Sequence, residues 1–123
     1  MKNVLIVDDS ATMRRMVMAS LGTLPEAKFD QAGSGLEAIE RLAVAAADLM
    51  VLDLNMPDMH GLEVLRFMRK HPAFSRIPVI VLTTKDEDAS RVAALEAGAS
   101  VYLTKPFQPA TLATHSRQLL HLE

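Results

Sequence analysis

Short apolar segments alternate with longer segments of helical periodicity along the chain, and this alternation limits the possible folds more than any other feature. Five short segments have the composition of strands: residues 4–8, 28–32, 49–53, 79–84 and 100–105. Each is followed by a segment whose apolar residues recur at the spacing of an amphipathic helix. Strict alternation of strands and helices predicts an α/β protein with a parallel sheet and helices on both faces.

The composition of the five segments also predicts their order in the sheet. The first, third and fourth are continuous apolar runs, which is typical of central parallel strands. The second contains Asp30, and the fifth contains Ser100 and Thr104, so both suit the edges. The pattern favours a flavodoxin-like (βα)5 doubly wound fold with strand order 2-1-3-4-5, because the dinucleotide-binding order requires a sixth strand.

Length and charge exclude several classes of protein. The chain has 123 residues, so we expect one domain over residues 1–123. A net charge of −2 argues against non-specific nucleic-acid binding, and the longest apolar run, residues 42–47, is too short to cross a membrane. The absence of cysteine fits a reducing compartment. We therefore expect a cytoplasmic protein that neither binds nucleic acid nor inserts into a membrane.

Polar side chains follow four of the predicted strands, at the point where each strand ends. These residues are Asp8 and Asp9 after the first strand, Asp53 at the end of the third, Thr83 and Thr84 at the end of the fourth, and Lys105 at the end of the fifth. Because the carboxyl ends of parallel strands meet at one edge of the sheet, where ligands bind in open α/β folds, these side chains are predicted to form one site.

The chemistry of this group points to phosphoryl transfer. Clustered carboxylates are suitable ligands for Mg²⁺, and Asp53 beside such an ion could act as a nucleophile. Lys105 is a point charge that suits a phosphoryl oxygen, and the threonines supply donors. Each residue alone has an ordinary explanation, and Asp9 fits a helix N-cap equally well. It is the whole set at one sheet edge that indicates a site.

Four stretches resemble the receiver domains of two-component response regulators, the CheY-like family. They are VDDSATMRR at residues 7–15, LDLNMPDMHG at 52–61, LTT at 82–84 and EAGASVYLTKPF at 96–107. The resemblance extends over nearly the whole chain, and single-domain chemotaxis regulators are the most similar members. It implies a signalling switch rather than an enzyme, with a domain that assists its own phosphorylation and autodephosphorylation.

The resemblance implies a role for each acid. Asp53 would be the phosphoacceptor, taking the phosphoryl group from a sensor histidine kinase or a histidine phosphotransfer protein. Mg²⁺ would be bound directly by Asp9, by Asp53 and by the backbone carbonyl of Asn55. Asp8 would act mostly through a metal-bound water.

The remaining implied roles concern phosphate binding and switching. Lys105 and Thr83, with Thr84 beside them, would bind the phosphoryl group, and the Lys105–Pro106 peptide bond is typically cis in this family. Thr83 and Tyr102 would form the switch, with the tyrosine ring turning inward as Thr83 moves. The helix 4–strand 5–helix 5 face would then signal to a downstream protein target, and chemotaxis is one candidate process. The protein would act as a monomer.

One position departs from the family pattern, and two others are expected to set the phosphate lifetime. A small residue usually follows the key threonine, where this chain has Thr84, and we hypothesise that its bulk narrows access to Asp53. Asn55 and Lys85 would flank the path of the water that removes the phosphoryl group.

Alternative functions stay open at this point. A haloacid-dehalogenase-like Mg²⁺-dependent phosphatase also uses an aspartate nucleophile, but it needs a second acid two residues later, where this chain has Asn55. A receiver that no longer takes phosphate, and a flavin carrier of the same topology, are less consistent with the polar residues. The chain could also be a receiver domain excised from a larger regulator, and the sequence names neither its kinase nor its output target.

Overall fold

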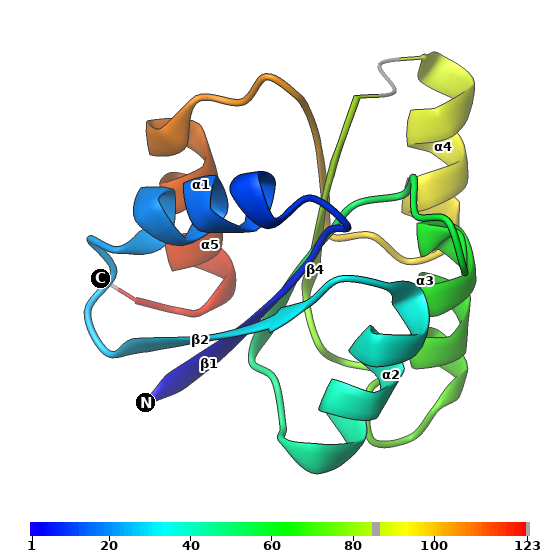
Figure 1. Ribbon diagram of the computed structural model, residues 1–123, viewed down its shortest axis with the longest axis horizontal. Coiled ribbons are helices and arrows are strands. Elements are labelled where there is room, and N and C mark those ends of the chain that lie inside the picture. The colour runs from blue at the N-terminus through cyan, green and yellow to red at the C-terminus, as the bar shows by residue number, and fades with distance from the viewer. Residues whose placement is uncertain (85–86, 123) are drawn as a thin grey trace.

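The computed structural model describes residues 1–84 and 87–122, and it consists of five strands and five helices in alternation (Figure 1). The elements are β1 (Lys2–Val7), α1 (Ala11–Leu21), β2 (Ala27–Ala32), α2 (Gly35–Val44), β3 (Leu49–Leu52), α3 (Gly61–Lys70), β4 (Val79–Thr83), α4 (Asp88–Glu96), β5 (Val101–Thr104) and α5 (Pro109–Leu119). Neighbouring strands are parallel, in the order β2-β1-β3-β4-β5. The predicted flavodoxin-like (βα)5 fold and its 2-1-3-4-5 order are confirmed.

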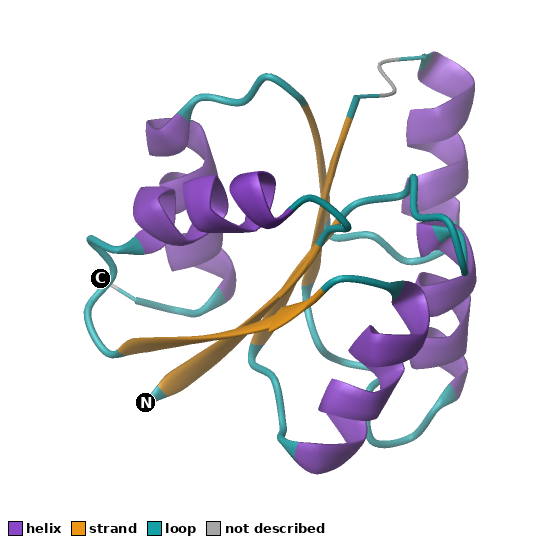
Figure 2. Ribbon diagram, viewed as in Figure 1, coloured by secondary structure: helices purple, strands orange, loops and turns teal. Residues whose placement is uncertain are grey.

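The helices cover both faces of the sheet (Figure 2). Helices α1 and α5 pack together on one face, and α2, α3 and α4 lie on the other. Alternate residues of β1 face the two layers: Val4 and Ile6 pack in the same cluster as Leu21 of α1, whereas Leu5 and Val7 pack with the α2 and α3 side. The protein therefore has two apolar cores, one on each side of the sheet.

Burial separates central strands from edge strands as the composition predicted. Every residue of β3 and β4 is buried, as are the last four residues of β1. The described residues of the edge strands β2 and β5 are mostly half-buried or exposed. The carboxyl ends of the central strands, where the polar residues lie, are thus supported by a rigid apolar sheet.

Local sequence signals explain how several helices begin and end. Ser10 caps α1 by accepting a hydrogen bond from the backbone N–H of Met13, at 3.2 Å. Pro109 occupies the first turn of α5, where its fixed φ and missing N–H are tolerated. Gly98 follows α4 with a φ of 113°, a left-handed conformation that favours glycine. The interpretation of Asp9 as a helix cap is wrong, because Ser10 has that role.

Within the described residues, none of the helices has both the length and the apolar character that a membrane crossing requires.

Candidate functional site

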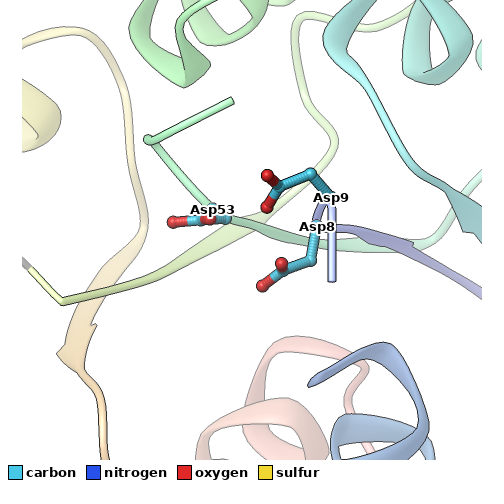
Figure 3. Close-up of side chains that lie close together, drawn as sticks. All are labelled: Asp8, Asp9 and Asp53. Carbon is cyan, nitrogen blue, oxygen red and sulfur yellow. The ribbon is translucent and has the colours of Figure 1, made fainter. Parts of the chain in front are cut away.

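Three carboxylates meet where β1 and β3 end. Asp8 and Asp9 follow β1, Asp53 follows β3, and oxygen atoms of all three lie within 4.8 Å of one another (Figure 3). Asp8 and Asp53 are buried, with 4% and 6% of their surface exposed, whereas Asp9 is exposed. Backbone pairing sets this arrangement, because the N–H of Asp53 donates to the carbonyl of Val7 and so aligns the two strand ends.

Lys105 lies between two of the acids. Its Nζ donates to Oδ2 of Asp8 at 2.7 Å and is 3.7 Å from Oδ2 of Asp53, and its side chain is 11% exposed. The N–H of Lys105 donates to the carbonyl of Thr83 at 2.7 Å, which places the residue directly beside the end of β4. The Lys105–Pro106 peptide bond is cis. A largely enclosed ammonium therefore offsets part of the negative charge of the cluster.

Asp8 and Asp9 differ in how they are held. Oδ1 of Asp8 accepts from the N–H of Ser10 at 2.9 Å, and Oδ2 accepts from Lys105, so both oxygens have donors. The N–H of Asp8 donates to the carbonyl of Ala32 at 3.1 Å. In the part of the chain that the structure describes, no donor reaches the carboxylate of Asp9. Asp9 is the carboxylate of the cluster that faces solvent with its oxygens available.

The environment of Asp53 raises its pKa above the usual value. Burial of the carboxyl is the main cause, and the charges of Asp8 and Asp9 act in the same direction. Lys105 and the N–H of Asn55, which donates to Oδ1 of Asp53 at 3.3 Å, act against it. Within the described residues, the charge of Lys105 does not balance the three carboxylates, and an excess of negative charge is the electrostatic condition for binding a divalent cation.

The other predicted site residues lie around this cluster. Thr83 is fully buried at the end of β4, whereas Thr84 and Asn55 are exposed. Tyr102 is half-buried on β5 and packs against the core on the α2–α4 side. Lys85 lies outside the described residues. The structure therefore brings Asp8, Asp9, Asp53 and Lys105 into contact distance, and it places Thr83 on the strand beside them.

Sequence reasoning missed two residues that shape the loop between β3 and α3. The carboxylate of Asp58 accepts from the N–H groups of Gly35 and Leu36, at 3.1 and 3.0 Å, and so attaches this loop to the start of α2. His60 caps α3 through Nδ1, which accepts from the N–H of Leu62 at 3.2 Å. Asp58 lies in one of the stretches that carry the family resemblance, but its partners are 22 and 23 residues away, so no local pattern reveals them.

The Asp58 contact predicts a pH-dependent contribution to stability. Backbone hydrogen bonds, first of all that from Leu36, lower the pKa of Asp58 below its ordinary value of 3.8. A lowered folded-state pKa stabilises the protein above the unfolded value and loses that effect as the pH falls through the folded one. We expect Asp58→Asn to be less stable than the wild type at neutral pH, with a difference that shrinks on acidification. Urea unfolding of both proteins at neutral pH and at about pH 3 measures this, and a pH-independent difference would contradict it.

Comparisons with known proteins agree with this geometry. Residues 4–117 match the family described as "Response regulator receiver domain". The chain is 40% identical over 110 residues to Chemotaxis protein CheY1 of Helicobacter pylori strain ATCC 700392 / 26695, which is 89% of either chain. It is 37% identical over 121 residues to the cyclic di-GMP phosphodiesterase response regulator RpfG of Xanthomonas campestris pv. campestris strain 8004, a match over 98% of this chain and 32% of that protein.

Solved structures show the same architecture. Chemotaxis protein CheY4 of Vibrio cholerae superposes with a TM-score of 0.88 at 32% identity, over 97% of this chain and 98% of the other. The Mn²⁺-bound form of response regulator Rcp1 superposes with a TM-score of 0.87 at 30% identity, over 98% and 95% of the two chains. The extent of the family match, together with the acidic cluster and the strand order, shows that this chain belongs to the response regulator receiver domain family.

Proposed function

We propose that the protein is a phosphorylation-dependent switch in which Asp53 accepts a phosphoryl group from the phosphohistidine of a kinase or a phosphotransfer protein. The observation that supports this proposal is the position of Asp53, a buried carboxylate close to two other acids and to Lys105. In the transfer, a carboxylate oxygen of Asp53 forms a bond to phosphorus while the phosphorus–nitrogen bond of the donor histidine breaks. The product is an acyl phosphate on Asp53 and a free histidine on the donor.

The acidic cluster fits Mg²⁺, the metal proposed for this reaction. Asp9, Asp53 and the backbone carbonyl of Asn55 would bind it directly. Asp8 would act through water, since both of its carboxylate oxygens already accept hydrogen bonds. A bound divalent cation neutralises charge on the phosphoryl oxygens. The Mn²⁺-bound structure of Rcp1, a similar protein, supports a divalent cation in this class of domain.

This division between the two adjacent acids gives a testable result. We expect Asp9→Ala to weaken Mg²⁺ binding more than Asp8→Asn, by about tenfold or more, because a direct carboxylate ligand is lost. Isothermal titration of the two variants and the wild type with MgCl₂ measures the difference. Equal losses in the two variants, or a larger loss in Asp8→Asn, would contradict the assignment.

Lys105, Thr83 and Thr84 are proposed to bind the phosphoryl group. The ammonium of Lys105 donates to Asp8 and lies 3.7 Å from Oδ2 of Asp53, and its backbone N–H donates to the carbonyl of Thr83. A phosphoryl group adds charge and strong acceptors at this point, so Lys105 and Thr83 are the groups that it would attract first. The exposed Thr84 would restrict access to Asp53 from solvent.

We further propose that Thr83 and Tyr102 transmit the change to the α4–β5–α5 face. Tyr102 pairs in register with Val81 of β4, two residues before Thr83. On α4 of the same face, the apolar side chains of Val92 and Leu95 are about half exposed, at 51% and 46%. Their exposure supports a role of this face in binding a downstream protein, and the similarity to CheY1 favours chemotaxis as the process.

Phosphorylation by a small donor tests the proposed function. The protein is incubated with acetyl phosphate and MgCl₂, and intact mass is measured for wild type and Asp53→Ala. We expect a mass increase of one phosphoryl group in the wild type that requires Mg²⁺ and is absent in the variant. No adduct in the wild type would contradict the proposal, whereas steady turnover of small phosphate esters would favour the phosphatase alternative.

The wider context of the domain is also a proposal. We take residues 1–123 as one receiver domain that acts as a monomer in the cytoplasm. The similarity to RpfG, in which the matched region is 32% of the protein, shows that domains of this kind also occur within longer regulators. A domain excised from such a regulator would use the same phosphoacceptor site and differ in its output.

A further inference from the structure

Arg14 contacts the backbone between the two acids that follow β1. Its Nη1 donates to the carbonyl of Asp8 at 2.7 Å, and its Nε donates to Oε1 of Gln31 at 2.9 Å. Arg14 lies on α1 and Gln31 on β2, so the guanidinium connects a helix, an edge strand and the loop that carries the acids. Within the described residues, Arg14 contacts none of the three carboxylates of the cluster.

The carbonyl of Asp8 belongs to the peptide that joins Asp8 to Asp9. A peptide unit is planar, so the direction of this carbonyl also fixes the direction in which the chain enters Asp9. Asp8 is held by its own side chain through Ser10 and Lys105. The carboxylate of Asp9 has no donor in the described part of the chain, so the position of Asp9 depends on its backbone.

We infer that Arg14 is a positioning residue for the divalent-cation site, acting through the Asp8–Asp9 peptide to hold the Asp9 carboxylate opposite Asp53. The inference rests on the proposed function, because it assumes that Asp9 is a direct ligand of the cation. The guanidinium suits this task, since its planar fork makes two bonds in one fixed geometry. Gln31 orients the fork from the side of β2.

Electrostatics and positioning make opposite predictions for the loss of Arg14. A guanidinium near a cation site repels the cation, so its removal by charge alone would strengthen binding. Loss of a group that orients a ligand weakens metal binding instead, typically by tenfold or more. The sign of the change therefore distinguishes the two effects.

Arg15 provides a matched control. It is the next residue of the same helix, carries the same charge and is exposed. Within the described residues, its Nη2 donates a hydrogen bond of 3.4 Å to Oγ1 of Thr12, a neighbour on α1, and Arg15 makes no contact with the loop that carries the acids. A change that depends only on the net charge of α1 should be the same in Arg14→Ala and Arg15→Ala.

The experiment is a titration with MnCl₂ in which electron paramagnetic resonance measures free Mn²⁺. We expect Arg14→Ala to weaken Mn²⁺ binding about tenfold, and Arg15→Ala to stay within about twofold of the wild type. Arg14→Lys keeps the charge and one donor to the Asp8 carbonyl but loses the fork that also bonds Gln31, so it should recover part of the affinity. Circular dichroism of each variant at the same temperature verifies that it is folded.

Several outcomes would overturn the inference. Unchanged or tighter binding in Arg14→Ala, while the wild type binds, would show that Arg14 does not position the ligand, and the proposed function would stand. Arg14→Lys binding as weakly as Arg14→Ala would also contradict it. A wild type that binds no Mn²⁺ would refute the metal site itself.

If Arg14→Ala does not fold, Gln31→Ala replaces it. We expect this variant to bind Mn²⁺ about threefold more weakly than the wild type, and an unchanged affinity would contradict the inference.

Discussion

Replacing Lys105 by Met should lower the free energy of unfolding of the metal-free protein by about 3 kcal/mol, because it leaves a buried carboxylate without its partner. The ammonium of Lys105 is 2.7 Å from Asp8 and 3.7 Å from Asp53, and the side chains of Lys105 and Asp8 are 11% and 6% exposed. Methionine fills a similar volume but supplies no charge. Among the described residues, no side-chain cation in contact with Asp8 or Asp53 would then remain to offset the repulsion among the three acids.

A divalent cation should reverse much of this loss. A ligand that binds only the folded state stabilises it according to its concentration and affinity. Since Mg²⁺ would supply the charge that Lys105→Met removes, the increase in stability on adding Mg²⁺ should be larger in the variant than in the wild type. Urea unfolding with EDTA and with MgCl₂ measures both effects. A smaller increase in the variant would show that the cation does not interact with the same carboxylates as Lys105.

The ion pair of Arg41 and Asp30 is a matched control. It joins a cation on α2 to an acid on β2 at 2.8 Å, the same kind of contact, but its side chains are 43% and 36% exposed. Exposed pairs contribute about 0–1 kcal/mol, so Arg41→Met should change stability little. If Lys105→Met were no more destabilising than Arg41→Met, the burial of the acidic cluster would not have the energetic effect that we assign to it.

The topology was predictable because it depends on features that are local in sequence. Continuous apolar runs marked β3 and β4 as central, and polar residues such as Asp30 marked the edges. Parallel strands then bring their carboxyl ends together, so the positions of Asp53 and Lys105 followed from the order of the strands alone. The acidic cluster could therefore be expected from the strand order without knowledge of the side-chain conformations.

The contacts that hold the site could not be predicted in this way. Asp8 is bonded to Lys105, 97 residues later, and Asp58 reaches the start of α2, both of which depend on side-chain conformations set by packing. Arg14 lies within a stretch that carries the family resemblance, but its contact with the Asp8 carbonyl is a property of the folded loop. Sequence pattern gives the residues of a site, whereas their orientation comes from tertiary contacts.

Gly61, at the start of α3, should tolerate no side chain because it lies against the backbone of Asp53, the proposed phosphoacceptor. A Cβ at this position would be 2.6 Å from the carbonyl oxygen of Asp53 and 2.7 Å from Cα of Leu54. Backbone atoms at the end of a buried strand cannot move aside as a flexible side chain can. We expect Gly61→Ala to lower the free energy of unfolding by about 3 kcal/mol, at the upper end of the usual cost of overpacking.

The same substitution at Gly22 is the control. A Cβ there would meet its nearest atom, the carbonyl oxygen of Ala19, at 3.4 Å, and the φ of Gly22 is −64°. Alanine can adopt this conformation, so Gly22→Ala should be neutral or more stable by up to about 1 kcal/mol. Urea unfolding compares the two variants directly, and equal stabilities would contradict the predicted clash.

A functional measurement separates a local shift of Asp53 from a general loss of stability. If Gly61→Ala moves the Asp53 backbone, Mg²⁺ affinity and phosphorylation by acetyl phosphate should both decrease at a temperature where the variant remains folded. The N–H of Gly61 donates to the carbonyl of Leu54 at 2.9 Å, so the start of α3 and the end of β3 are directly connected. A variant that is destabilised yet binds Mg²⁺ as the wild type does would show that the helix moves instead of the strand, since only displacement of Asp53 changes the metal site.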